Sequence, residues 1–280
     1  MKITVLTDNC VRCGTTLTGE HGFSMLIETD GRTILFDTGQ SGRFLSNARI
    51  IGAPVEAIDT VVLSHGHYDH TGGLPALSAF LSESRGAPPD FFCHPAALCR
   101  RKRIRNNNVL INDPGAVLNS YSTTHSTTGT KRIADGLWLL SGVESTAPFE
   151  KRRAGDEIEQ DGVWIPDLVP DDAALVWEGS RGLVIIAGCA HAGVCSTIEA
   201  AIAATGEERI ADVIGGLHMV SASTSRIRAT REYLEGCRLK EIHPCHCTGF
   251  EATIAFAKTL PVKDCRVGWT ANFETMPTQY

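Results

Sequence analysis

The sequence of 280 residues predicts an α/β protein in which two mixed β-sheets pack together with helices outside them. Short apolar runs form hairpins early in each half of the chain, and strand–helix units follow them. The composition is that of an ordinary globular protein, with 42% hydrophobic residues and 27 glycines. It therefore excludes a disordered, collagen-like or coiled-coil chain.

The first half of the chain starts with a strand pattern at residues 1–6 and continues with a hairpin. Residues 23–29 and 32–36 form the two arms of this hairpin, because Asp30-Gly31 supplies the positive φ values of a tight turn. Further along, we expect a buried strand at 60–64, a helix at 74–81 opened by two glycines, and a strand at 90–93.

The second half contains two more hairpins, at 133–140 and 173–187. A helix follows at 194–204, because Val194, Ile198 and Ile202 share one helical face. The remaining elements are a strand at 211–214, a helix at 226–234, a strand at 241–243 and a helix at 248–260. No repeat or long linker divides the chain, so we expect one domain over residues 1–280, with an irregular inserted lobe around 100–160.

Charge and cysteine content narrow the possible partners. The formal net charge of −6 argues against non-specific nucleic-acid binding but allows an anionic substrate. No apolar run approaches the ~20 residues of a membrane helix, so we expect no membrane partner. The N-terminus has no signal-peptide pattern, and we expect a cytoplasmic location in which the ten cysteines are thiols or metal ligands. The sequence leaves open whether the protein forms a homo-oligomer.

The strongest motif is Ser64-His65-Gly66-His67-Tyr68-Asp69-His70, between a predicted strand and a predicted helix. His65 and His67 project to the same side in extended backbone, because side chains alternate there. Asp69 and His70 lie on the turn into the helix, where they can face a second ion. Imidazoles with one carboxylate suit zinc, iron or manganese. The sequence therefore predicts one or two divalent transition metals, with zinc as the first choice.

This motif resembles the His-x-His-x-Asp-His signature of the metallo-β-lactamase superfamily. Residues 35–39, Leu-Phe-Asp-Thr-Gly, resemble an early strand-end motif in which the carboxylate, here Asp37, supports the metal loop. More narrowly, the chain is similar to the 7,8-dihydropterin-6-methyl-4-(β-D-ribofuranosyl)aminobenzene-5′-phosphate synthase subgroup. The segments that carry this similarity are 20–24, 65–74, 93–95, 171–175, 188–193, 215–218 and 246–249. The resemblance implies an αββα sandwich.

The resemblance also implies further ligands beyond the first motif. His246, after the last predicted strand, matches the final histidine of the superfamily. His191 follows the 183–187 strand, where the superfamily places a bridging Asp after a Gly. An imidazole cannot bridge two ions as a carboxylate can, and this departure argues against a symmetric site with two ions. Asp172 lies where the usual third histidine is expected. His94 and His218 also follow strands, and each is either a ligand or a supporting histidine that hydrogen-bonds a carbonyl.

Two groups are candidates for substrate binding. The run Arg100-Arg101-Lys102-Arg103-Ile104-Arg105 is either a phosphate clamp, with Arg101 and Arg103 as the chosen candidates, or a solvated or oligomeric surface. Asp8, Asn9 and His21 precede or follow early strands and are expected near the metal loop. Cys10-x-x-Cys13 has the spacing of a zinc knuckle or a redox pair, although no second such pair exists.

These residues predict a metal-dependent enzyme acting on a small anionic substrate, phosphorylated and of pterin type by resemblance. The chemistry would use a metal-bound hydroxide or a metal-stabilised leaving group, with Asp69 and His191 as the catalytic candidates. The synthase resemblance implies a transferase that releases diphosphate. The alternatives are a hydrolase of a phosphodiester, thioester or lactone, and, from another class, a non-catalytic metal or ligand sensor.

Overall fold

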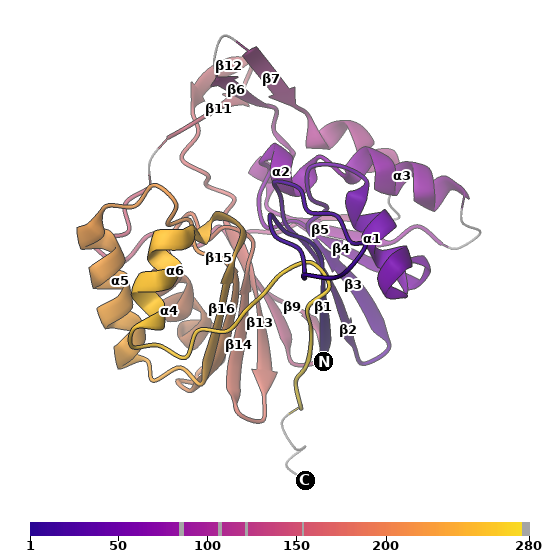
Figure 1. Cartoon of the computed structure of the whole chain (residues 1–280). Helices are drawn as coiled ribbons and strands as arrows, with labels where there is room; N and C mark the ends of the chain where they lie inside the picture. Colours follow the sequence, from indigo (N-terminus) through magenta and orange to yellow (C-terminus); the bar gives the residue numbers. More distant parts are fainter. Residues whose placement is uncertain (84–86, 106–107, 121–122, 153, 276–280) are drawn as a thin grey trace.

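A computed structural model of the chain describes residues 1–83, 87–105, 108–120, 123–152 and 154–275. Two large sheets lie face to face, helices cover their outer sides, and a small third sheet projects from one end (Figure 1). The predicted α/β fold with two mixed sheets and outer helices is therefore confirmed.

The first sheet is mixed, with antiparallel pairing from β17 to β3 and parallel pairing from β3 to β8. In spatial order, its strands are β17 (Thr270–Asn272), β1 (Lys2–Thr7), β2 (Ser24–Thr29), β3 (Arg32–Phe36), β4 (Thr60–Val62), β5 (Asp90–Cys93) and β8 (Thr123–Ser126).

The second sheet is also mixed, because β14, β15 and β16 run parallel while the other pairs are antiparallel. In spatial order, its strands are β16 (Glu241–Cys245), β15 (Ile210–Gly216), β14 (Gly182–Ala187), β13 (Ala173–Gly179), β10 (Leu137–Ser141) and β9 (Gly129–Ala134).

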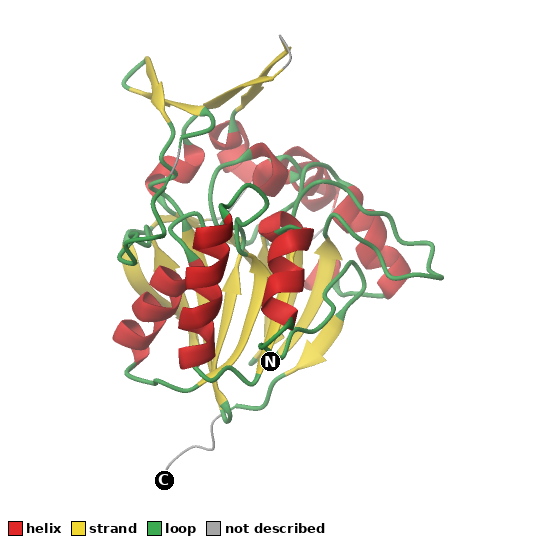
Figure 2. Cartoon of the chain, turned by 60° about the vertical axis from the view of Figure 1, so that its left-hand side comes forward, coloured by secondary structure: helices red, strands yellow, loops and turns green. Residues whose placement is uncertain are grey.

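Helices close both outer faces of the sandwich (Figures 1 and 2). The α-helices are α1 (Arg43–Ile51), α2 (Tyr68–Thr71), α3 (Leu74–Glu83), α4 (Val194–Thr205), α5 (Thr224–Gly236) and α6 (Phe250–Ala257). Short 3₁₀-helices are η1 (Val55–Ala57), η2 (Pro95–Leu98), η3 (Pro114–Ser120) and η4 (His246–Thr248). Among the described residues, every helix is too short or too polar to cross a bilayer.

The apolar core has three layers, because strands of both sheets bury side chains on two faces. In β14, Leu183 and Ile185 pack under α4, α5 and α6, whereas Val184 and Ile186 face the other sheet. This alternation follows from the two-residue period of a strand. Such continuous apolar runs are typical of strands that are covered on both sides.

The third sheet consists of β12 (Val163–Pro166), β11 (Glu157–Gln160), β6 (Arg101–Arg105) and β7 (Asn108–Asn112), in that order. It projects beyond the strand ends in both views (Figures 1 and 2) and was not predicted. The segment expected as an irregular lobe is more regular than the sequence indicated, since β8, β9 and β10 return to the two large sheets. The extent of the domain itself stays a prediction.

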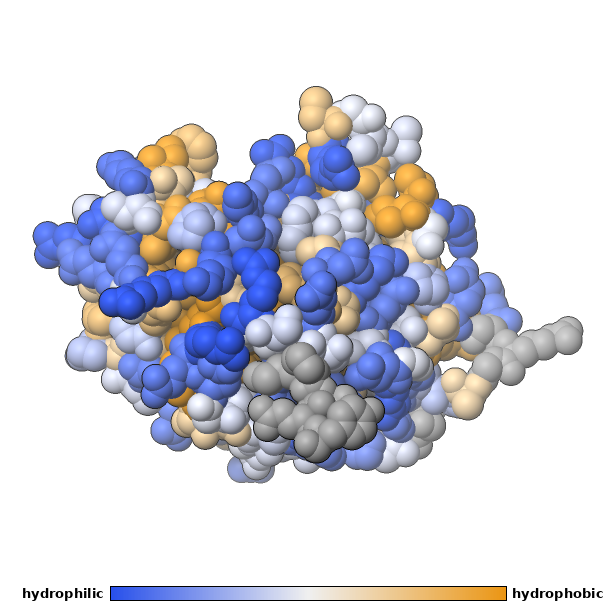
Figure 3. Space-filling view, turned by 90° about the horizontal axis from the view of Figure 1, so that it is seen from below, coloured by the Kyte–Doolittle hydropathy of each residue, from blue (hydrophilic) through white to orange (hydrophobic). Residues whose placement is uncertain are grey.

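One end of the sandwich collects the loops that carry the predicted site residues. Asp37 follows β3, His65 follows β4, His191 follows β14 and His246 follows β16. Carboxyl ends of parallel strands meet at one edge, where α/β proteins bind ligands. The opposite end is shown in Figure 3, where hydrophilic residues surround smaller hydrophobic areas.

Candidate metal centre

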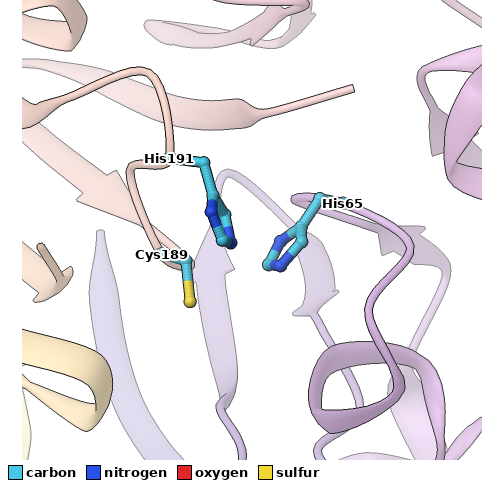
Figure 4. A group of neighbouring side chains, drawn as sticks. All are labelled: His65, Cys189 and His191. Carbon is cyan, nitrogen blue, oxygen red and sulfur yellow. The ribbon is translucent and has the colours of Figure 1, made fainter. Parts of the chain in front are cut away.

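Three imidazoles meet where strands of the two sheets end. His65 and His67 lie on the loop after β4, and His191 lies on the loop after β14. Their ring centroids form a triangle with sides of 4.6, 4.8 and 4.9 Å. Figure 4 shows the rings of His65 and His191 facing each other, with the Cys189 thiol close to both. These three histidines form the first candidate ligand group.

A second group lies directly beside the first. His70 Nε2 is 3.2 Å from His246 Nε2, and His246 Nε2 is 3.6 Å from Asp69 Oδ2. His21 Nε2 lies 3.0 Å from the same carboxylate oxygen of Asp69. The two imidazoles and the carboxylate of this group come from opposite sheets, as in the first group.

Cys189 stands between the two groups. Its Sγ lies within 4.8 Å of ligand atoms of His65 and His191, and within 4.8 Å of those of His70 and His246. The distance from Cys189 Sγ to His70 Nε2 is 3.2 Å. Cys189, which directly follows Gly188, thus occupies the shared position that the sequence assigned to His191. A thiolate sulfur can contact two ions, whereas an imidazole cannot.

Other side chains hold the outer nitrogens of these imidazoles. Asp37 accepts from His70 Nδ1 at 2.7 Å, and Asn9 Oδ1 lies 2.9 Å from His246 Nδ1. Ser64 Oγ lies 2.9 Å from His65 Nδ1 and donates to Asp37 at 2.6 Å. Such partners fix the tautomer and the ring orientation, so that the other nitrogen is presented as a ligand.

His67 is also held by a carboxylate, but here Nδ1 faces the other imidazoles and Nε2 contacts the supporting side chain. Its Nδ1 lies 3.1 Å from His65 Nε2, and its Nε2 faces Asp167 Oδ2 at 3.3 Å. Asp167 in turn accepts from Arg101 Nε at 2.7 Å. Burial would raise the pKa of Asp167, but the hydrogen bond with His67 and the charge of the buried Arg101 hold it well below its usual value.

The protonation states suit metal ligands. Burial lowers the pKa of His65 and of His191 well below the usual value, and lowers that of His246 to about 4. Burial would raise the pKa of Asp69, but the hydrogen bond from His21 and the neighbouring imidazoles hold it well below its usual value. These four groups are therefore in the forms that bind cations at neutral pH.

His70 differs from the other imidazoles. Although burial lowers its pKa, Asp37 outweighs burial and raises the pKa of His70 to about 9. A metal ion must therefore displace a proton from His70.

The residues present fit divalent transition metals. His191 Nε2 is buried with no hydrogen-bond partner among the described residues. Among the described residues, three clusters of candidate ligand atoms that lie within 4.8 Å of one another include Cys189, namely those with His65 and His191, with His70 and His246, and with His218 and Cys247; a fourth consists of Asp212, Glu241 and His243. Nitrogen, sulfur and carboxylate donors are those preferred by zinc and its neighbours.

Sequence and structure comparisons place these motifs in a known family. The model of the metallo-β-lactamase superfamily matches residues 17–92. An uncharacterised protein of Methanocaldococcus jannaschii, MJ0448, is 30% identical over 239 residues, which cover 83% of this chain and 86% of that protein. The chain belongs to the metallo-β-lactamase superfamily.

Two other relatives extend over nearly the whole chain. The 7,8-dihydropterin-6-methyl-4-(β-D-ribofuranosyl)-aminobenzene-5′-phosphate synthase of M. jannaschii is 29% identical over 268 residues, 91% of this chain and 90% of the synthase. The crystal structure of Tm1679, described as a metal-dependent hydrolase of the β-lactamase superfamily, superposes with a TM-score of 0.82 and 28% identity, covering 97% and 98% of the two chains. The predicted likeness to the superfamily and to the synthase is confirmed.

The structure brings the 65–70 motif together with His191 and His246, as the sequence predicted. Three other candidates do not belong to either of these two ligand groups. The His94 ring caps η2, because its Nδ1 accepts from Ala96 N at 3.1 Å. Asp172 accepts from Ala192 N at 2.7 Å and so supports the loop that carries His191. His218 packs 4.1 Å from the His191 ring, and its ring nitrogen can meet Cys189 and Cys247. All three support or border the site.

Within the basic run, Arg101 does not serve as a phosphate-binding group. Arg101 is buried, and its guanidinium donates to Asp167 at 2.7 Å and to Asp171 at 2.6 Å. Arg100 and Lys102 pair with glutamates of β11, and Arg103 pairs with Asp156 at 3.5 Å. Two carboxylates thus neutralise Arg101, which positions the His67 loop instead of binding an anion.

The remaining substrate candidates divide into two sets. Asp8 accepts from His246 N at 2.8 Å and from Cys10 N at 2.9 Å, so it holds the His246 loop rather than facing a substrate. Burial raises the pKa of Asp8 to about 6. Asn9 serves the same loop through its contact with the His246 ring. His21 is half exposed beside Asp69, and Arg103 lies over the Tyr68 ring at 5.2 Å, so both stay candidates for substrate contact.

Sequence analysis missed several supporting residues. Asp167 stands alone between apolar residues and gives no local signal, and Asp171 stands out in the sequence only as part of segment 171–175. Buried Glu150 accepts from the backbone nitrogens of Cys195 and Ser196 and so fixes the start of α4, which follows the His191 loop. Cys10 and Cys13 are exposed thiols, and no candidate ligand group among the described residues includes them.

Proposed function

We propose that this protein is a metal-dependent enzyme that acts on a small phosphorylated substrate. The observation that carries the proposal is the convergence of the two ligand groups, with Cys189 between them, at the end of the sandwich. Nothing in ordinary packing requires several imidazoles to face one another with their outer nitrogens hydrogen-bonded.

In this proposal, His65, His67 and His191 hold one ion, and Asp69, His70 and His246 hold a second, with zinc as the first choice and iron or manganese as alternatives. A bound divalent ion supplies Lewis-acid chemistry toward a phosphoryl or carbonyl oxygen. Asp69 is ionised and contacts His21 at the half-exposed side, so the pair can accept and relay a proton near the substrate. A cytoplasmic, reducing location would keep Cys189 a thiol, as it is in the structure.

Two reaction types are supported by different relatives. The similarity to the dihydropterin-type synthase over nine-tenths of the chain favours a transferase that acts on a pterin-type phosphorylated substrate. The similarity to Tm1679, a metal-dependent hydrolase, favours hydrolysis. A phosphodiester, a thioester and a lactone are the substrate classes to be tested for that reaction. Either reaction type would use the same candidate metal ligands of this chain, so an assay must separate the two.

The test combines metal content with the variant His67→Ala. Wild-type protein reconstituted with zinc should hold about one to two equivalents and turn over a substrate from a panel of phosphate esters, thioesters and lactones. His67→Ala should lose most of the activity and part of the metal while keeping its circular-dichroism spectrum. His125→Ala is the matched control, because that ring stacks on Phe92 outside both ligand groups. Full metal content and no turnover of any substrate would favour a sensor, and no metal uptake would refute the proposal.

A further inference from the structure

A small cavity adjoins the first ligand group on the side of α5. It has a volume of about 170 Å³, and His191 and His218 form part of its wall. Ligand pockets for whole small molecules commonly measure about 300–1,000 Å³, whereas one water takes about 30 Å³. The cavity therefore suits a compact group of a ligand rather than an entire ring system.

The wall of the cavity is positively charged. Lys151, Arg152 and Arg226 line it, and no carboxylate is found among its described lining residues. Among the described residues, neither Lys151 nor Arg152 forms an ion pair with a carboxylate. This differs from Arg101, whose charge is neutralised by two aspartates.

Arg152 is held in place by uncharged acceptors. Its guanidinium donates to the carbonyl oxygens of Leu168, at 3.0 Å, and of Val169 and Val143. Carbonyl groups fix the orientation of the guanidinium but carry no net charge. The positive charge of Arg152 is therefore kept available next to the cavity.

The start of α5 adds polar groups to the same wall. Ser221 and Ser223 line the cavity, and Ser223 caps the 13-residue helix by accepting from Arg226 N at 3.3 Å. The amino end of a helix favours anions. His218, which also lines the cavity, has a buried Nδ1 with no hydrogen-bond partner among the described residues. A ligand with several oxygens would satisfy these groups together.

We propose that this cavity, defined by Lys151, Arg152, His218 and Arg226, binds the phosphate of a phosphomonoester substrate. The proposal rests on the proposed function, because the cavity shares His191 with the first ligand group. A dianionic phosphate offers oxygens that can accept from two guanidinium groups and an ammonium group at once. The rest of the substrate would then extend from the cavity toward the two ligand groups.

The test measures binding of inorganic phosphate and of phenyl phosphate to the zinc-loaded protein by titration calorimetry. Lys151→Gln and Arg226→Gln should each weaken binding of both probes on the order of tenfold or more, because each loses a charge-assisted hydrogen bond. Arg226→Lys should recover part of the affinity. Arg228→Gln is the matched control on the same helix, since Arg228 is exposed, pairs with Glu232 at 3.9 Å and does not line the cavity. Its affinity should stay within twofold of wild type.

Zinc content, measured on every variant, separates this proposal from the proposed function. Unchanged zinc with weakened phosphate binding supports the cavity assignment whether or not a substrate has been found. Phosphate affinity that is the same in Arg226→Gln, Lys151→Gln and wild type would overturn it, and would indicate binding at the ligand groups alone. Binding of inorganic phosphate with no binding of phenyl phosphate would overturn the assignment to a phosphomonoester.

Discussion

Asp37→Asn offers a sharp test of how the second ligand group is built. The Asp37 carboxylate is fully buried and accepts three hydrogen bonds, from Ser64 N at 2.7 Å, Ser64 Oγ at 2.6 Å and His70 Nδ1 at 2.7 Å. Asparagine has the same shape and tolerates the left-handed backbone at this position, where φ is +58°. The substitution therefore changes the chemistry of the site and leaves its backbone in place.

The expected effect follows from the donor and acceptor count. An asparagine amide NH₂ in place of Oδ2 would face His70 Nδ1, which must then become an acceptor. A neutral His70 then carries its single proton on Nε2, the nitrogen that points to His246 and Cys189, whereas beside Asp37 the proton that remains after metal binding is on Nδ1. In the variant, Nε2 is therefore blocked as a metal ligand. Loss of such a supporting carboxylate typically costs about 10–100-fold in metal affinity. Loss of charge-assisted hydrogen bonds lowers the free energy of unfolding by about 1.5–3 kcal/mol.

Zinc affinity is measured by competition with a chromophoric chelator, and stability by urea unfolding of the zinc-free protein. Asp30→Asn is the matched control, because Asp30 has the same side chain at a positive φ of 42° but is exposed in a hairpin turn. The control should match wild type in both measurements. If Asp37→Asn also kept wild-type zinc affinity, the ligand role of His70 Nε2 would be refuted.

Two further predictions concern buried charges. Arg101→Met should lower the free energy of unfolding by about 3–5 kcal/mol, because it leaves two buried aspartates without their cation. Arg100→Met, at the exposed end of the run, should lower it by less than about 1 kcal/mol. Equal losses of the two variants in urea unfolding would contradict this prediction. Burial raises the pKa of Asp212 despite its contact with His243. The contribution of Asp212 to the free energy of unfolding is fully present below about pH 4, the pKa of an aspartate in the unfolded chain. It is lost as the pH rises through the raised pKa of Asp212 in the folded protein. Asparagine cannot titrate, so the free energy of unfolding of Asp212→Asn, measured at about pH 4.5 and about pH 7, should fall less between the two pH values than that of wild type. An equal fall in the variant and in wild type would count against the prediction.

The regular elements were predictable because their signals are local. The Asp30-Gly31 turn, the alternation along 183–187 and the helical face of Val194 and Ile198 each depend on a few neighbouring residues, and the structure has them where expected. The third sheet was not predictable in this way. Its strands β6 and β11 are separated by about fifty residues of other structure, and the basic composition of β6 resembles an exposed helix as well as a strand.

The sequence alone identified the superfamily of this protein and its main candidate metal ligands, because His65, His67, Asp69 and His70 form a motif within six residues. Only the tertiary structure decided what surrounds that motif. It put Cys189 between the ligand groups, joined Arg101 to two aspartates about seventy residues away, and left Lys151 and Arg226 beside a cavity. The physical reason is that the availability of a charge depends on which groups lie within a few ångströms, and long-range packing sets those distances. The cations of a basic run can therefore be neutralised, while Lys151 and Arg152, far from that run in the sequence, line the cavity without an ion pair to a carboxylate among the described residues.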